Sequence, residues 1–182
     1  MEDLGHVGDP AKAVLYPGTI PALRRLGDRF VLFVVTNQNG VAKGITRLED
    51  VCKVNEQVVR TLAEAGIAIR EVYCCPHQRS DGCACIKPNP HFGKLAERDH
   101  DLDLVRSFVI GDHPADVEFA ANLGARGIYV LSGHGEKHRG ELAVPCAVVD
   151  GIAAAVDVIL AGETAAAGGT LQRRTLTKGN DP

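Results

Sequence analysis

The sequence has few aromatic residues and no excess of positive charge. Its 182 residues include five Phe, three Tyr and no Trp, and 20 Lys and Arg stand against 23 Asp and Glu, which gives a formal net charge of -3. Nucleic-acid grooves combine a basic surface with aromatic side chains that stack on bases. We therefore expect no nucleic-acid partner, and no global charge that would attract the chain to an anionic membrane.

Long apolar segments are missing as well. The longest, 31–35 and 152–160, are short or interrupted by Asp157, whereas a membrane helix needs about 18 apolar residues. The first residues, Met-Glu-Asp, lack the cationic start of a signal peptide. We therefore expect a cytoplasmic protein without a membrane partner, in which the six cysteines stay reduced and act as core residues or metal ligands.

Short apolar runs alternate with helical patterns along the chain. Continuous β-branched runs suit strands covered on both faces of a parallel sheet, and the runs that predict strands are 30–36, 72–75, 107–111, 127–131 and 146–150. Strand and helix in alternation imply right-handed crossovers. The fold class predicted is α/β, a doubly wound and mostly parallel sheet.

Helix boundaries and the domain limit can also be predicted. Thr46 to Glu49 has the spacing of a capping box that opens a helix ending at Gly66. Residues 114–123 predict a second helix, closed by a glycine. We expect one monomeric domain over 1–163 and a disordered tail over 164–182, where the sequence becomes polar and loses its apolar periodicity.

Three predicted strand ends carry polar residues, at the edge where such sheets bind ligands. The sequence Thr-Asn-Gln-Asn-Gly at 36–40 offers neutral donors to an anion, although a plain turn is equally expected there. Lys87, held between prolines, can neutralise a phosphate oxygen, and the alternative is an ordinary surface lysine. Asp112 and Asp116 suit a hard cation such as Mg²⁺, unless Asp112 only caps the following helix.

A compact group of soft metal ligands precedes Lys87. Three thiols and one imidazole within eleven positions favour a closed, structural zinc site, and the ligands predicted are Cys75, His77, Cys83 and Cys85. Cys74 should point to the opposite face of its strand, and Cys52 and Cys146 are expected to be small core residues.

The other histidines show no ligand-like spacing. We expect at least three of four to be simple surface residues: His6, His100, His134 and His138. His91 should begin a helix.

In this order, the three strand ends resemble motifs two, three and four of the haloacid dehalogenase superfamily of phosphatases, over residues 16–130. The Thr-Asn-Gln-x-Gly sequence, the Cys-x-His-x(5)-Cys-x-Cys segment and Lys87-Pro88 are similar to the subgroup that contains heptose 1,7-bisphosphate and histidinol-phosphate phosphatases. The resemblance implies a Mg²⁺-dependent phosphomonoester hydrolase for a small phosphorylated metabolite, with a haloacid-dehalogenase-like fold, no cap domain and a small zinc loop.

The same resemblance implies a role for each motif residue. Thr36, Asn37 and Lys87 would bind the phosphoryl group. Gln38 and His113 would contact the substrate, and Asp112 and Asp116 would hold Mg²⁺. Heptose bisphosphate phosphatases usually carry Arg at the position of Ile86 and often Lys at that of His113, so the resemblance favours a monophosphate substrate here, such as histidinol phosphate or a sugar monophosphate.

One family motif is missing from the sequence. The family reaction uses two aspartates of a strand ending in Asp-x-Asp-Gly-Thr, the first as nucleophile and the second as general acid, and no such sequence occurs here. Asp3 and Asp9 do not lie at a strand end. We expect the functional protein to begin upstream of Met1. The alternatives are a catalytically inactive, zinc-stabilised relative that binds phosphate, and a polynucleotide 3′-phosphatase, which the composition disfavours.

Overall fold

The computed structural model describes residues 8–171, and within 163–171 the backbone alone. Five strands are present in this part of the chain: β1 (Leu32–Asn37), β2 (Ile69–Cys75), β3 (Phe108–Gly111), β4 (Arg126–Val130) and β5 (Ala147–Val149). The helices are α1 (Thr19–Arg24), α2 (Leu48–Glu64), α3 (His91–His100), α4 (Pro114–Leu123), α5 (Gly135–His138) and α6 (Ile152–Leu171). Short 3₁₀ helices are η1 (Pro10–Lys12), η2 (Gly27–Arg29), η3 (Arg79–Asp81), η4 (Leu104–Arg106) and η5 (Arg139–Glu141).

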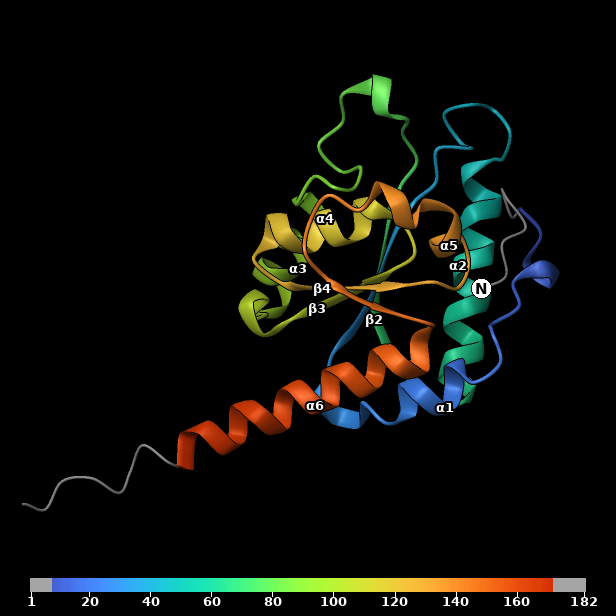
Figure 1. The fold of residues 1–182 in the computed structure, drawn as a ribbon. Helices are drawn as coiled ribbons and strands as arrows, with labels where there is room; N and C mark the ends of the chain where they lie inside the picture. The colour runs from blue at the N-terminus through green and yellow to red at the C-terminus, as the bar shows by residue number, and fades with distance from the viewer. Residues whose placement is uncertain (1–7, 172–182) are drawn as a thin grey trace, which may run out of the picture.

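The predicted α/β class is confirmed, because every observed pairing is parallel and helices lie on both sides of the strands (Figure 1). The side chains of β3 and β4 alternate between two cores. Ile128 and Val130 pack with α1 and α6 on one face, while Val109 packs with Phe119 of α4 and its neighbours on the other. None of the described helices is long and apolar enough to cross a membrane.

The strands form two sheets and not one. β1 pairs with β2, and β3, β4 and β5 pair in that order, so within residues 8–171 no ladder joins β1 to β3. The carboxyl ends of both sheets nevertheless line one cavity. The predicted single sheet is therefore divided into one sheet of β1 and β2 and one of β3, β4 and β5.

One local prediction was wrong. The residue preceding α2 is Arg47, whose side chain makes no capping hydrogen bond and instead pairs with Asp50 at 2.9 Å, so the capping box at Thr46 does not form. Helix α6 continues to Leu171, beyond residue 163, and the domain limit expected at that residue stays a prediction. Residues 172–182, the rest of the predicted tail, lie outside the described part of the chain.

Candidate active site

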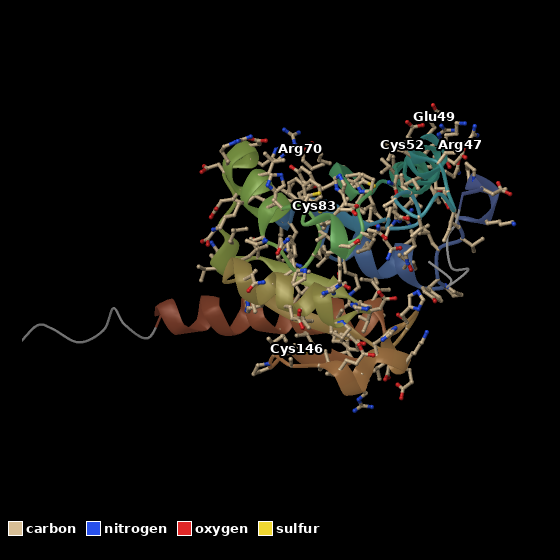
Figure 2. All side chains as sticks on the ribbon, turned by 90° about the horizontal axis from the view of Figure 1, so that it is seen from above. Arg47, Glu49, Cys52, Arg70, Cys83 and Cys146 are labelled. Carbon is tan, nitrogen blue, oxygen red and sulfur yellow. The ribbon has the colours of Figure 1, made fainter. Side chains whose placement is uncertain are left out.

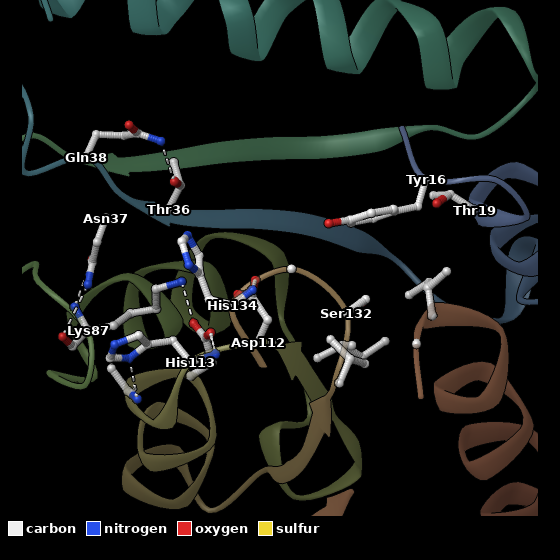
Figure 3. A pocket seen from close by; sticks show the side chains of 18 of the residues that line it. Tyr16, Thr19, Thr36, Asn37, Gln38, Lys87, Asp112, His113, Ser132 and His134 are labelled. Carbon is white, nitrogen blue, oxygen red and sulfur yellow. Dashed lines mark hydrogen bonds and ion pairs between the residues drawn. The ribbon is translucent and has the colours of Figure 1, made fainter. Parts of the chain in front are cut away.

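A cavity of about 1550 Å³ lies where the carboxyl ends of β1 and β3 face each other, and we call it the cleft. It is bordered by side chains from both sheets, from the loop after β2 and from the turn after β4 (Figure 3). All the predicted phosphate, substrate and Mg²⁺ residues line it: Thr36, Asn37, Gln38, Lys87, Asp112, His113 and Asp116. Residues up to 80 positions apart in the sequence therefore meet at one site, as the common edge of parallel strands requires.

Lys87 and Asp116 form a buried ion pair at the base of the cleft. Lys87 Nζ lies 2.7 Å from Asp116 Oδ1, and the two side chains are only 13% and 10% exposed. The ammonium also donates to the carbonyl oxygen of Val35 at 2.6 Å. An ammonium has three donors, so one remains for an anion in the cleft.

Asn37 positions the segment that carries Lys87. Its Oδ1 accepts from the Lys87 backbone N–H at 3.0 Å and its Nδ2 donates to the Lys87 carbonyl at 3.3 Å. The next polar pair is Gln38 and Thr36, in which Gln38 Nε2 donates to Thr36 Oγ1 at 2.9 Å. The hydroxyl of Thr36 thus has an acceptor lone pair occupied and its own proton available for an oxyanion.

Asp112 does not cap the following helix. The capping residue is His113, whose Nδ1 accepts from Ala115 N–H at 3.2 Å, while Asp116 Oδ2 accepts from His113 N–H at 3.0 Å. Burial lowers the pKa of His113, which favours the neutral ring that this acceptor role requires. Both oxygens of Asp116 are therefore engaged within the protein.

The Asp112 carboxylate is instead held by the turn after β4. Its Oδ2 accepts from the backbone N–H of His134 at 2.9 Å. Gly133 precedes this donor with φ +68°, and a Cβ at that position would collide with the same carboxylate oxygen. A glycine is thus required both by the left-handed backbone and by the close approach of Asp112.

Several cleft residues were not predicted from the sequence. Lys43 and Arg79 line the cleft as exposed cations from the loops after β1 and β2. His134, expected on the surface, also lines it, and the ring of His138 lies beside that of His113, tilted by 48° with ring centroids 4.9 Å apart. The prediction was therefore wrong for these two residues and for His100, which is partly buried and bonds Glu71 at 3.1 Å. His6 lies outside the described residues.

The predicted zinc ligands come together beside the cleft. The ligand atoms of Cys75, His77, Cys83 and Cys85 all lie within 4.8 Å of one another. Sulfur–sulfur distances are 3.2 to 3.7 Å, close to the about 3.8 Å expected for thiolates around one tetrahedral zinc. Burial raises the pKa of Cys75 to about 12, so zinc binding there has to displace a proton. The cluster could hold one zinc ion.

The remaining cysteines are dispersed. Cys52 is exposed and lies near Arg47 and Glu49 at the outer end of α2, far from Cys83 and Cys146 (Figure 2). The prediction of a core role for Cys52 was wrong, because this helix position faces solvent. Cys74 and Cys146 are partly buried, and Cys74 is not among the clustered ligands.

We expect the substitution Cys83→Ser to abolish stoichiometric zinc binding. A structural site needs all four ligands, and its metal contributes directly to folding free energy. Elemental analysis should find about one zinc per wild-type chain and a small fraction of that in the variant, with a lower midpoint of urea unfolding. Cys146→Ser is the matched control and should keep its zinc. Four freely titrating thiols in the purified wild-type protein, with no zinc, would contradict the assignment.

The chain is similar to proteins of a known hydrolase family. The HAD-hydrolase-like family model matches residues 84–155. D-glycero-beta-D-manno-heptose-1,7-bisphosphate 7-phosphatase of Bordetella bronchiseptica is 32% identical over 132 residues, which cover 72% of this chain and 74% of that protein. The Yersinia pestis protein of the same name is 31% identical over 151 residues, 78% of this chain and 80% of its own. The bifunctional histidine biosynthesis protein HisB of Blochmanniella floridana is 33% identical, but the match covers 64% of this chain and only a third of that protein (33%).

A solved structure superposes on most of this chain. The D,D-heptose 1,7-bisphosphate phosphatase of B. bronchiseptica, complexed with magnesium and phosphate, superposes with a TM-score of 0.81 and 28% identity over 89% of this chain and 92% of that one. In this chain, the parallel fold and the meeting of Thr36, Lys87 and Asp112 at the cleft define a hydrolase of the phosphatase class. The chain belongs to the haloacid dehalogenase-like hydrolase family. The relatives described above are heptose-bisphosphate phosphatases and a histidine biosynthesis enzyme of that family.

Proposed function

We propose that the cleft binds and hydrolyses the phosphomonoester of a small phosphorylated sugar, with Mg²⁺ as cofactor. The observation that carries this proposal is the meeting of Thr36, Lys87 and Asp112, from three separate segments, around one cavity. Phosphoryl transfer depends mostly on positioning and charge neutralisation. A hydroxyl donor, an ammonium and a carboxylate at one point supply these two functions.

Each residue has a distinct part in binding. Lys87, with its remaining donor, and the Thr36 hydroxyl contact phosphoryl oxygens. Asn37 keeps the Lys87 backbone in place, Gln38 orients the Thr36 hydroxyl, and His113 lies on the wall that the substrate contacts.

The donor set at Asp112 fits Mg²⁺, which prefers carboxylate and water oxygens. Asp112 accepts a single described hydrogen bond, so its carboxylate retains free lone pairs. Asp116 supports the site indirectly, because its oxygens hold Lys87 and the His113 backbone. Mg²⁺, when bound, neutralises negative charge on the phosphoryl group.

We assign no attacking group among the described residues, so turnover is to be measured on a form of the protein that also carries the family's Asp-x-Asp motif. Asp9 accepts from Ala11 N–H at 3.0 Å as the cap of η1, which explains its conformation without a catalytic role, and Asp3 lies outside the described residues. We further infer that residues 1–163 act as the phosphatase unit of a cytoplasmic monomer.

Heptose 1,7-bisphosphate is the first substrate to test, since relatives carry that name. The sequence favoured a monophosphate because Ile86 and His113 replace two cations, but Lys43 and Arg79 line the cleft and can contact a second phosphate. We expect Arg79→Gln to raise KM for the bisphosphate about tenfold, as loss of one charge-assisted hydrogen bond would. KM for a sugar monophosphate should change less than about twofold.

Steady-state phosphate release from both substrates measures this difference, with Arg139→Gln, outside the cleft, as the control. Equal KM changes for both substrates would show that Arg79 does not contact the second phosphate. Histidinol phosphate as the better substrate would assign the chain to the other branch of the family.

A further inference from the structure

The turn after β4 is constrained on both sides of His134. Gly133 has φ +68°, and Gly135 lies so close to β4 that a Cβ there would collide with the carbonyl oxygen of Val130. Glycine is therefore required on either side of His134. The buried hydroxyl of Tyr129 also donates to the Gly135 carbonyl oxygen at 2.8 Å. Packing and hydrogen bonding thus hold the Gly133–Gly135 turn in one conformation.

Both backbone groups of His134 are used inside the protein. Its N–H donates to Asp112 Oδ2 at 2.9 Å, and its carbonyl oxygen accepts from the N–H of His138 at 3.2 Å. A backbone fixed at both groups also fixes the direction of the Cα–Cβ bond. The ring is then free to differ only in its side-chain torsions, which favour a few discrete rotamers. The imidazole therefore leaves the turn in a defined direction.

That direction leads into the cleft. His134 is half-buried and lines the cavity. Figure 3 shows its imidazole pointing from the turn toward the side of the cleft where Thr36 and Lys87 lie. The Asp112 carboxylate lies next to the backbone of the same residue. The ring is thus directed at the place where the phosphoryl group and its Mg²⁺ are proposed to bind.

We propose that the His134 imidazole is a further phosphoryl-binding group, which donates a hydrogen bond to a phosphoryl oxygen beside Thr36 and Lys87. A neutral imidazole carries one N–H and a protonated one carries two, so the ring can donate in either state. One short turn then serves both parts of the site, because its backbone holds the Mg²⁺ ligand Asp112 and its side chain contacts the anion. Fixed donors of this kind stabilise a transferring phosphoryl group without having to reorganise.

This inference rests on the proposed function, because it adds a residue to the same anion site. The competing role for His134 is structural, in which its backbone supports Asp112 and its side chain does nothing. Alanine separates the two roles, since it keeps the N–H that bonds Asp112 and removes the imidazole.

Binding of inorganic phosphate to the 182-residue protein tests the proposal without turnover. We expect His134→Ala to weaken phosphate binding about tenfold in calorimetric titrations, the loss of one hydrogen bond to a charged group. His134→Gln, whose amide can donate, should recover part of the affinity. The matched control is His91→Ala, which removes an exposed histidine that is not among the lining residues. It should bind phosphate within about twofold of wild type.

Mg²⁺ supplies a readout that distinguishes the side chain from the turn. Because alanine at position 134 leaves the Asp112 carboxylate held by the same N–H, Mg²⁺ should still strengthen phosphate binding by the wild-type factor, within about twofold. If the Mg²⁺ effect disappears in His134→Ala together with the phosphate affinity, His134 acts by supporting Asp112, and the proposal is overturned.

The ring protons of His134 report the contact directly. The imidazole Hε1 signal that is missing from the NMR spectrum of His134→Ala belongs to His134, and in the wild-type protein it should shift with phosphate and saturate at the calorimetric Kd. An unshifted signal, or unchanged phosphate affinity in His134→Ala, overturns this inference and leaves the proposed function standing. A wild-type protein that binds no phosphate refutes the anion site itself, and this inference with it.

Discussion

Replacing Lys87 with methionine is expected to lower the free energy of unfolding by about 3–5 kcal/mol, the cost of leaving a buried carboxylate without its partner. The Lys87 and Asp116 side chains are 13% and 10% exposed and lie 2.7 Å apart. Methionine keeps the volume of the aliphatic stem but removes the charge. Asp116 then retains only the His113 backbone N–H as a described donor. Urea unfolding followed by circular dichroism measures the loss.

The double variant Lys87→Met/Asp116→Asn is the control. Asparagine can still accept from the His113 N–H, and no unpaired charge remains. We expect it to recover most of the lost stability while phosphate binding stays abolished. If the free energy of unfolding of the Lys87→Met variant lies within about 1 kcal/mol of the wild-type value, the pair is not buried and the Lys87 charge lies in solvent.

The locations of the site residues were predictable, because the position of a residue at the end of a parallel strand determines which edge of the sheet it occupies. Thr36, Lys87 and Asp112 were placed in one site on this basis, and all three line the cleft, although Lys87 lies in the loop after β2 and not at a strand end. The zinc ligands were predictable from spacing alone, since a short loop limits how far Cys75 and Cys85 can separate.

The roles of individual side chains depend on contacts that spacing does not reveal. Asn37 offers an amide to the cleft, yet it bonds the backbone of Lys87, 50 positions away. Asp112 could have capped α4, but His113 takes that position, and the Asp112 carboxylate turns to the Gly133–His134 backbone. The hydrogen-bond partner of each side chain depends on which distant segments pack against it. The turn after β4, which binds Asp112, carries no sequence motif that predicts this contact.

The pairing of the strands could not be predicted from the sequence either. The apolar runs predicted five strands, and five are described, each within about two residues at either end except the start of β2. A run shows that a strand is apolar on both faces, but not which neighbour satisfies each edge. The division between β1 and β3 therefore became visible only in the pairing of backbone groups.

Replacing Asp112 with asparagine should reduce Mg²⁺-dependent phosphate release by about 10²–10³-fold, the usual effect of removing one preorganised electrostatic contact from a transition state. Stability should change by less than about 1 kcal/mol, because asparagine Oδ1 can still accept from the His134 N–H that holds Asp112. A large loss of function with little loss of stability separates metal binding from a structural role.

The matched control is Asp150→Asn, which makes the same charge change at another residue of the cleft lining. It lies after β5 and has no described contact with Lys87 or Asp112, so turnover should stay within about twofold of wild type. A binding measurement supports the same conclusion without turnover: Mg²⁺ should strengthen the binding of inorganic phosphate to the wild-type protein and to the Asp150→Asn variant, but not to Asp112→Asn. If Mg²⁺ still strengthens phosphate binding in the Asp112 variant, the cation is held elsewhere in the cleft, and the carboxylate fixed by the Gly133–His134 turn is not its ligand.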